Sequence, residues 1–235
     1  KKWIAILPGS KKAKLSIGIP FFLEVADRIK ECEDNINLMI PIAPTTELED
    51  FIFFQSAKNP ITKYYSSNIK SIKKIENSIF NYVLETCKNT KIFILQQNSN
   101  HNILSQCKLA LTTVGANTAE LAAINLPMIV VLPTQHLNAM NAWDGIFGII
   151  GRIKLLNRIQ TFIIKRWYLK NNKFFAWPNI KANKQIIPER VGIISPKDIS
   201  DEAIYLLKEK DLLVEQKLNL LKMRGKRGAV KKLSN

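Results

Sequence analysis

Short apolar runs alternate with longer amphipathic stretches along most of this chain, and this alternation restricts its fold more than any other feature. Five runs have the length and the leucine-rich or β-branched composition of buried strands: WIAIL, NLMIPIA, KIFILQ, KLALTT and PMIVVL. Helical or loop segments separate them, and strands that alternate with helices are typical of a parallel sheet. The sequence therefore predicts an α/β fold with a mainly parallel sheet and flanking helices.

The helices are predicted from apolar spacing and from cap residues. Residues 19–33 carry apolar side chains every three or four positions, whereas residues 8–20 before them are expected to form a loop. In the helix expected over residues 45–57, Thr46 stands three residues before Glu49, which is the spacing of a capping box.

The pattern changes after the fifth strand. Residues 143–177 are apolar and basic, as in a helix on an anionic membrane surface, although a buried hairpin whose lysines reach water is the alternative. From residue 195 on, two or three polar-faced helices are expected, the first capped by Ser200 or Asp198. The pattern thus divides the chain into an α/β core (1–135), a basic apolar insertion (136–178) and a remainder with the carboxyl-terminal helices (179–235).

The composition favours a polyanionic partner and a reducing environment. Lys and Arg number 35 against 19 Asp and Glu, so the formal net charge is +16. A nucleic acid, a phosphorylated substrate or an anionic membrane surface would suit it. Cys32, Cys87 and Cys107 are odd in number and widely spaced, so they predict neither a disulfide framework nor a zinc site, and a cytoplasmic setting fits them.

Two features of the chain as a whole bear on its setting. No apolar run approaches the roughly 20 residues of a membrane-spanning helix, so no such segment is expected. The sequence opens on an apolar run without an initiator methionine or a signal-peptide pattern. We interpret it as a fragment whose upstream half is missing.

The loop LPGSKKAK, after the first predicted strand, is a candidate phosphate site. Gly9 and Ser10 allow a tight turn that presents backbone N–H groups, and Lys11 and Lys12 add positive charge. The loop lacks the glycine and lysine spacing of a P-loop. An ordinary strand-to-helix loop with solvated lysines is the alternative.

The stretch TTVGANTAELAAINLPMIVVL joins a predicted strand to a helix over residues 117–124. Gly115 would let a diphosphate approach the backbone near the helix start, and the Glu120 carboxylate would accept hydrogen bonds from ribose hydroxyls. Asn117 and Glu120 also have capping-box spacing. In that alternative Glu120 only satisfies a backbone N–H group.

The segment AWPNIKANKQIIPERVG places two polar residues, Asn179 and Glu189, in apolar surroundings bounded by prolines. We interpret the first as part of a rigid turn and both as parts of a site wall; a plain turn residue and a solvated or helix-start charge are the alternatives. His101 and His136 are the only histidines and are too far apart in sequence for a local metal pair, so surface or capping roles are expected of them.

Taken in order, these motifs resemble the lipid-A-disaccharide synthase family, inverting glycosyltransferases that join two acylated glucosamine units. The family's proline-glycine-serine-arginine turn is similar to residues 8–11, its serine-glycine-threonine-alanine-threonine-leucine-glutamate motif to residues 114–120, and its proline-methionine-valine strand to residues 127–130. Its leucine-proline-asparagine-isoleucine segment and later proline-glutamate resemble residues 177–180 and 188–189, and RGKRGAVKKL resembles its terminal helix. The glycine loop looks most like that of the cyanobacterial relatives.

The resemblance implies a GT-B fold, in which two Rossmann-like domains face each other across a cleft. This chain would be the carboxyl-terminal, donor-binding half, and the amino-terminal acceptor domain would be absent. Glu120 would hold the ribose of UDP, the loop of residues 115–118 would approach the diphosphate, and Asn179 with Glu189 would close the donor site. The implied substrate- and UDP-binding residues are Gly9, Ser10, Lys11, Gly115, Asn117, Thr118, Glu120, Asn179 and Glu189.

In the implied reaction of lipid A biosynthesis, the 6-hydroxyl of a 2,3-diacylglucosamine 1-phosphate attacks the anomeric carbon of UDP-2,3-diacylglucosamine and releases UDP. The family's general base lies in the missing half, so no catalytic residue is assigned. The resemblance implies no metal and no cofactor beyond the UDP-sugar donor, allows a homodimer, and implies peripheral association with the inner face of the cytoplasmic membrane.

Other functions stay open. One is transfer from another UDP-sugar to a different glycolipid, and a second is non-catalytic binding of a nucleotide-sugar or a lipid. Nucleic-acid binding would explain the net charge of +16. However, the sequence has no zinc-finger, RRM-like or helix-turn-helix pattern and its basic residues are dispersed, so no nucleic-acid partner is expected.

Overall fold

The computed structural model describes residues 2–42, 46–96, 100–136 and 174–224. Five of its strands are the five apolar runs of the sequence. The elements are β1 (Lys2–Leu7), α1 (Lys12–Cys32), β2 (Ile36–Ile42), α2 (Leu48–Gln55), η1 (Thr62–Tyr64), β3 (Ile69–Lys74), β4 (Tyr82–Thr86), β5 (Lys91–Gln96), α3 (His101–Leu104), β6 (Leu109–Thr113), α4 (Asn117–Ala123), β7 (Met128–Pro133), α7 (Trp177–Ala182), β8 (Glu189–Gly192), α8 (Pro196–Lys208) and α9 (Lys210–Arg224).

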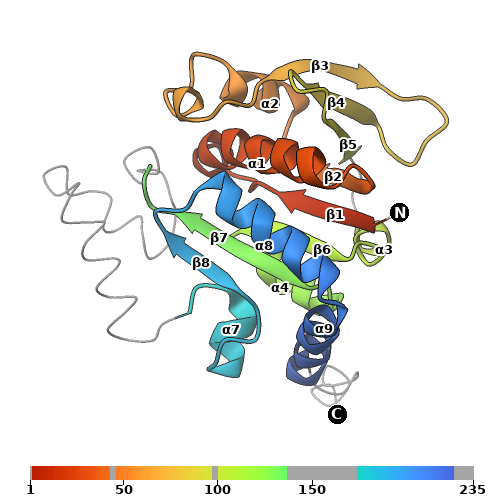
Figure 1. Ribbon diagram of the computed structural model, residues 1–235, viewed down its shortest axis with the longest axis vertical. Coiled ribbons are helices and arrows are strands. Elements are labelled where there is room, and N and C mark those ends of the chain that lie inside the picture. Colours follow the sequence, from red (N-terminus) through yellow and green to blue (C-terminus); the bar gives the residue numbers. More distant parts are fainter. Residues whose placement is uncertain (1, 43–45, 97–99, 137–173, 225–235) are drawn as a thin grey trace, which may run out of the picture.

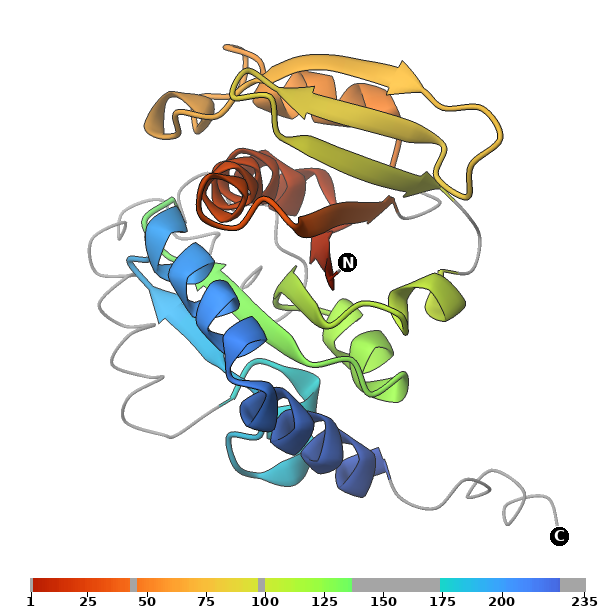
Figure 2. The same cartoon turned by 45° about the vertical axis from the view of Figure 1, so that its right-hand side comes forward.

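One eight-stranded sheet, in the order β3-β4-β5-β2-β1-β6-β7-β8, runs through the molecule (Figure 1). The pairings from β5 to β8 in this order are all parallel, whereas β4 is antiparallel to both of its neighbours, β3 and β5, at one edge. Helices α1, α2 and α8 share one core with the sheet, and α4, α7 and α9 lie over its other face (Figure 2). The predicted α/β class with a mainly parallel sheet is confirmed.

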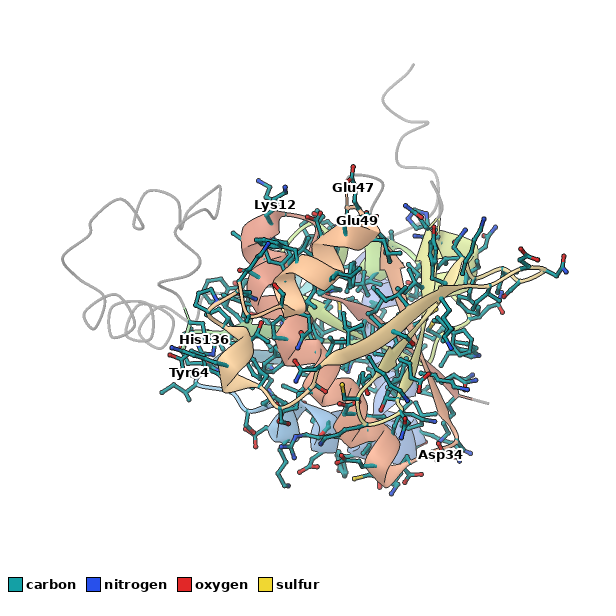
Figure 3. All side chains as sticks on the ribbon, turned by 90° about the horizontal axis from the view of Figure 1, so that it is seen from above. Lys12, Asp34, Glu47, Glu49, Tyr64 and His136 are labelled. Atoms are coloured by element: carbon teal, nitrogen blue, oxygen red, sulfur yellow. The ribbon has the colours of Figure 1, made fainter. Side chains whose placement is uncertain are left out.

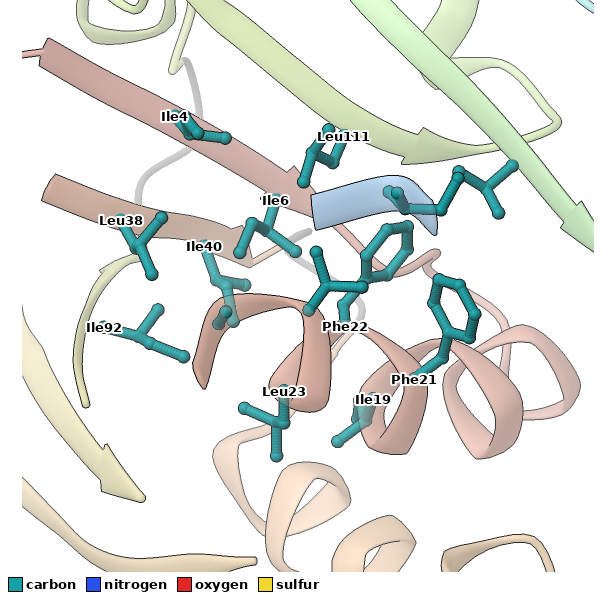
Figure 4. Close-up of a cluster of buried hydrophobic side chains, with 14 of the residues drawn as sticks. Ile4, Ile6, Ile19, Phe21, Phe22, Leu23, Leu38, Ile40, Ile92 and Leu111 are labelled. Carbon is teal, nitrogen blue, oxygen red and sulfur yellow. The ribbon is translucent and has the colours of Figure 1, made fainter. Parts of the chain in front are cut away.

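Strand β1 lies at the centre of the sheet and is buried on both faces. Ile4 and Ile6 belong to the core under α1 and α8, whereas Ala5 and Leu7 belong to the core under α4 and α9. This is the two-residue alternation of a strand, with both faces covered as in parallel sheets. Figure 4 shows part of the first of these cores, in which Phe22 of α1 lies toward the side chains of the strands and Ile19 and Leu23 lie on the other side of the helix.

Helix α1 begins at Lys12, so the loop predicted for residues 8–20 is wrong beyond Lys11. Pro20 lies inside the helix, and a proline there leaves the carbonyl four residues earlier without its N–H donor. That carbonyl belongs to Ser16, and the Nδ2 group of Asn59 donates to it at 2.7 Å. A side chain from another part of the fold thus replaces the missing helical hydrogen bond.

The predicted capping box of α2 is also wrong. The helix begins at Leu48 with Glu47 as its N-cap, and the cap makes no side-chain hydrogen bond. Phe51 and Phe54 are buried three residues apart on the inner face. Their packing sets the phase of the helix, which starts later than a box from Thr46 to Glu49 requires.

Helix α8 has a capping box, but not at the predicted residue. Ser195 is the N-cap: its Oγ accepts from the N–H of Asp198 at 3.1 Å, and its own N–H donates to the Asp198 carboxylate at 3.1 Å. Pro196 occupies the first helical position, where its missing N–H costs no hydrogen bond. Ser200 lies inside the helix and is buried.

Strands β3, β4 and β8 have no clear counterpart in the sequence pattern. β3 has the sequence IKSIKK, and its lysines suit an exposed sheet edge. The hairpin is tied to α1 by long-range contacts: Thr86 Oγ1 donates to the fully buried Asp27 at 2.6 Å, Ser67 Oγ donates to the same carboxylate, and the Ser66 N–H donates to Glu24 at 2.9 Å. No pattern in the local sequence predicts these partners.

The predicted insertion of residues 136–178 falls mostly on residues 137–173, which lie outside the described part of the chain. Its last two residues, Trp177 and Pro178, begin α7. β8, which follows the insertion, pairs in parallel with β7, which precedes it. The chain on both sides of the insertion therefore belongs to one sheet.

Replacing Asn59 by alanine should lower the free energy of unfolding by about 1–3 kcal/mol, because the carbonyls of Ser16 and Phe54 both lose a buried donor. Urea denaturation measures the change. Pro20→Ala is the matched control. In the Asn59→Ala background it should recover part of the loss, because alanine supplies an N–H to Ser16. If Asn59→Ala cost the same with proline and with alanine at position 20, the proposed replacement of the helical hydrogen bond would be contradicted.

Candidate functional site

The chain order of the sheet reverses between β1 and β6. β1 leads through α1 to β2 on one side, whereas β6 pairs with its other side, with Leu7 opposite Thr112. Both strands run in parallel, so their carboxyl ends meet at one edge, and ligands of open α/β sheets bind at such a reversal. The loops of residues 8–11 and 114–116 follow these two strands. The structure thus brings together two of the motifs that the sequence singles out.

The loop after β1 is pressed against the first turns of α1. Gly9 has a φ of 117°, and a Cβ on it would lie 2.6 Å from the Cβ of Lys14. A Cβ on Gly18 would lie 2.3 Å from the carbonyl oxygen of Pro8. Glycine at both positions therefore lets β1 turn directly into α1. Ser10 and Lys11 are exposed at the tip of this turn.

Lys14 connects this turn to the loop after β6. Its ammonium donates to the Val114 carbonyl at 2.9 Å. Gly115 has a φ of 149°, and a Cβ on it would lie 2.7 Å from the Lys14 Nζ. One side chain therefore contacts Gly9 along its stem and Gly115 at its charged end.

The amino end of α1 concentrates positive charge. This helix of 21 residues has no acidic residue in its first turn and no side-chain hydrogen bond at its N-cap, Lys11. Lys12 (Figure 3) and Lys14 follow, at the end where the helix macrodipole is already positive. Burial, followed by the charge of Lys11, lowers the pKa of Lys14. A phosphate or diphosphate bound here would relieve this repulsion and accept the first N–H groups of the helix.

The helix that carries Glu120 starts at Asn117, as predicted, and ends at Ala123. Its N-cap is Ala116, which makes no side-chain cap hydrogen bond, so the interpretation of Asn117 and Glu120 as a capping box is wrong. The Glu120 side chain is exposed, and Asn117 is partly exposed. The carboxylate is therefore accessible to a polar ligand.

Three predicted site residues form a buried scaffold. Thr118 Oγ1 donates to the Gly115 carbonyl at 2.8 Å and accepts from the Trp177 N–H at 3.1 Å, which joins the glycine loop to the start of α7. Asn179, with no exposed surface, donates to Glu189 at 2.7 Å and to the Ile187 carbonyl at 3.0 Å. Asn179 also accepts from two backbone N–H groups, those of residues 186 and 187. It lies in the first turn of α7 and so is not the predicted turn residue.

Glu189 begins β8 and is 5% exposed, so the alternative of a solvated or helix-start charge is wrong. Its carboxylate accepts from the N–H groups of Phe175 and Ala176 at 2.9 and 3.0 Å, and from Asn179. Burial raises the pKa of Glu189, and these hydrogen bonds oppose the rise. In the described structure Glu189 and Asn179 hold the chain that enters α7.

The histidines lie apart. His136 packs against Tyr64, with ring centroids 4.7 Å apart (Figure 3), and against Tyr65 at 5.7 Å. It is half-buried, and burial lowers its pKa. His101 begins α3 and is exposed, as predicted.

Lys14 and Thr113, the last residue of β6, were not predicted to belong to the site. A usable signal for Lys14 is the lack of any acidic residue in GSKKAKL, since helix starts favour acidic side chains. Nothing local distinguishes Thr113 from Thr112, because their environments differ only once α1 is packed on the sheet.

Neither a metal site nor a membrane span is found in the described ranges. No group of three or more His, Cys, Asp or Glu side chains there could hold a metal ion. No described helix is long and apolar enough to cross a membrane.

No family model matches the chain. Proteins named lipid-A-disaccharide synthase, however, are similar to most of it. The protein of Sulfurihydrogenibium sp. is 23% identical over 239 residues, which cover 100% of this chain and 50% of the relative. The chain resembles lipid-A-disaccharide synthases. Those of Francisella philomiragia and Nitrosococcus oceani are 24% and 22% identical, over 87% and 89% of this chain and 39% and 40% of their own lengths.

The resemblance expected from the motifs is thereby confirmed. The chain spans about half the length of the first of these synthases and less of the others, and it matches a carboxyl-terminal portion. Its sheet and flanking helices are consistent with one Rossmann-like half of a GT-B glycosyltransferase. The two loops at the strand reversal lie where such a half binds ligands.

The stability of the fold should depend on pH through Glu189. Its folded pKa is raised above the ordinary 4.5, so the folded protein binds the proton more tightly than the unfolded chain. The stabilisation by this proton is complete below about 4.5 and is lost as the pH rises through the folded pKa.

Urea denaturation of the wild type and of Glu189→Gln over a pH series measures this effect, because the glutamine does not titrate. The difference in unfolding free energy, wild type minus variant, should increase as the pH falls from neutrality toward 4.5. A difference that decreases on acidification would show that the hydrogen bonds to the carboxylate outweigh its burial.

Proposed function

We propose that this chain is the donor-binding half of an inverting glycosyltransferase like lipid-A-disaccharide synthase. The full enzyme would transfer 2,3-diacylglucosamine from UDP to 2,3-diacylglucosamine 1-phosphate in lipid A biosynthesis. The observation that carries the proposal is the similarity of the whole chain to a portion of a lipid-A-disaccharide synthase. The two loops at the strand reversal support it, since they combine glycines, N–H groups and lysines as a diphosphate requires.

The predicted residues then divide into those that would contact the ligand and those that would support the loops of the site. Gly9, Ser10, Lys11 and Gly115 would meet the diphosphate, and Asn117 and Glu120 would take the polar groups of the nucleoside, with Glu120 on the ribose. Lys11 stands where the family has arginine, so it offers charge without a bidentate fork. Thr118, Asn179 and Glu189 would act from behind, by holding the Gly115 carbonyl and the start of α7.

The chemistry divides between the two halves of the enzyme. The general base that takes the proton of the acceptor hydroxyl would come from the amino-terminal half. Positive charge at the start of α1 would stabilise the UDP leaving group. We propose no metal or cofactor for this step. A transferase for another UDP-sugar and glycolipid, or a binding module without catalysis, would use the same donor site.

Calorimetric titration of UDP into this chain at moderate salt tests the proposal. UDP should bind more tightly than ADP. Glu120→Ala should weaken UDP about tenfold, the loss expected for hydrogen bonds to a charged group. Glu209→Ala is the matched control, since Glu209 is an exposed carboxylate at the far end of α8 and should leave the affinity unchanged.

Absence of UDP binding, or binding indifferent to the base and to Glu120, would reject a UDP donor site. Selective UDP binding leaves the acceptor to be identified. A fusion of this chain to an amino-terminal half, assayed for disaccharide formation, separates the synthase from a module that only binds nucleotide.

We also propose peripheral association with the cytoplasmic face of the inner membrane, in keeping with acylated substrates and a net charge of +16. The chain should co-sediment with phosphatidylglycerol vesicles and less with phosphatidylcholine vesicles. The apolar segment of residues 143–177 is the predicted attachment, and five of its basic residues are Arg152, Lys154, Arg158, Lys165 and Arg166. Replacing these five by serine should lower the affinity for the phosphatidylglycerol vesicles about tenfold or more, because each basic residue near a membrane contributes about 1 kcal/mol. Equal binding to both kinds of vesicle would contradict an electrostatic attachment.

A further inference from the structure

A polar side chain is buried without a partner beside the two glycine loops. Thr113 ends β6 and is 7% exposed, and its hydroxyl oxygen has no hydrogen-bond partner among the described residues. The neighbouring Thr112 is also buried, but its hydroxyl donates to the Thr113 carbonyl at 3.1 Å. An unpaired buried hydroxyl costs free energy, so its retention at the carboxyl end of a central strand calls for a function.

Thr113 faces a small cavity under the start of α1. The cavity has a volume of about 10 Å³, close to the minimum that one water molecule needs. Its lining is apolar except at two residues, Thr113 and Lys14; the other lining residues are Ile17, Gly18, Phe21, Phe22, Val131, Leu132 and Pro133. It is too small for a phosphate and has polar groups for a single water.

Lys14 is therefore constrained on several sides. Its stem lies against Gly9, its ammonium donates to Val114, and it shares the cavity with Thr113. Lys11 and Lys12, in contrast, are exposed, and exposed lysines carry side-chain entropy that binding must overcome. Lys14 is thus a cation that the fold holds in place at the strand reversal.

We propose that Lys14 is the positioning residue of the diphosphate site, and that Thr113 orients its ammonium through one water molecule in the cavity. Lys14 holds the Gly9 and Gly115 loops at a fixed separation, so that their N–H groups reach the diphosphate together. Thr113 acts through Lys14 and does not touch the ligand. This inference rests on the proposed function for the identity of the ligand, UDP.

Titrations of UDP and of inorganic pyrophosphate into the intact chain and its variants test the inference. Lys14→Met should weaken both ligands about tenfold, the loss expected for a charge-assisted contact. Thr113→Val, which removes the hydroxyl at nearly constant volume, should weaken both about threefold, and Thr113→Ser should restore the affinity. Thr112→Val, whose side chain is directed to the opposite face of the sheet, is the matched control and should bind like the wild type.

Coupling between the two residues gives the sharpest result. If Thr113 acts through Lys14, Thr113→Val should have no further effect on affinity in the Lys14→Met background. Urea denaturation identifies any variant that binds weakly because it is unfolded. If Thr113→Val is such a variant, the comparison is made with Thr113→Ser.

The outcomes separate this inference from the proposed function. UDP affinity that is unchanged in Lys14→Met, or additive losses in the double variant, would overturn the inference and leave the donor site standing. Pyrophosphate binding that depends on Lys14, without any advantage of UDP, would support the positioning role and reject a UDP donor site. Failure of the wild type to bind either ligand would overturn both.

Discussion

The parallel pairing of β1 with β2 on one side and β6 on the other is the constraint on which the rest of the structure depends. It buries β1 on both faces, and it places the ends of β1 and β6 side by side. The backbone N–H groups of the loops that follow two parallel strands then lie at the same edge of the sheet. The close approach of the Pro8 carbonyl to Gly18, and of Lys14 to Gly9 and Gly115, completes this arrangement.

Charge at the start of α1 runs against the ordinary preference of helices. Three lysines and no carboxylate occupy a positive helix end, and one of the lysines is half-buried. The long apolar face of α1, with Phe21, Phe22 and Val25 buried, anchors the helix to the sheet despite this repulsion. Packing of the apolar face thus stabilises a helix whose positive end a diphosphate can neutralise. Binding sites commonly contain such locally unfavourable features, which the rest of the fold offsets.

Buried polar groups organise the other side of the site. Thr118 links the Gly115 loop to α7, and Asn179 with Glu189 links α7 to β8. Every hydrogen bond to the Glu189 carboxylate within the described residues comes from a backbone N–H or from Asn179. The carboxylate therefore stays buried without a cationic partner in the described structure. The motifs that resemble those of the synthases therefore include residues that shape the loops as well as residues accessible to a ligand.

Local patterns succeeded where one residue type has one physical role. The five apolar runs became strands because β-branched and leucine-rich segments of that length need burial. Gly9 and Gly115 were recognised because glycine suits a tight turn and a close approach to the backbone, and in the structure both have a positive φ. Caps were misplaced, since Thr46, Ser195 and Ser200 all have the chemistry of a cap, and only the packing of the apolar face decides which of them stands at the helix start.

The sequence by itself determined the α/β class, the position of both glycine loops and their resemblance to a family, because these depend on composition and on short spacings along the chain. Only the tertiary structure decided that α1 continues through Pro20, that Asn179 and Glu189 are buried together, and that Lys14 and Thr113 line one cavity. Each of these depends on a partner distant in sequence, such as Asn59 for Ser16 or Val114 for Lys14. Side-chain partners of this kind become neighbours only when the sheet has brought its strands together.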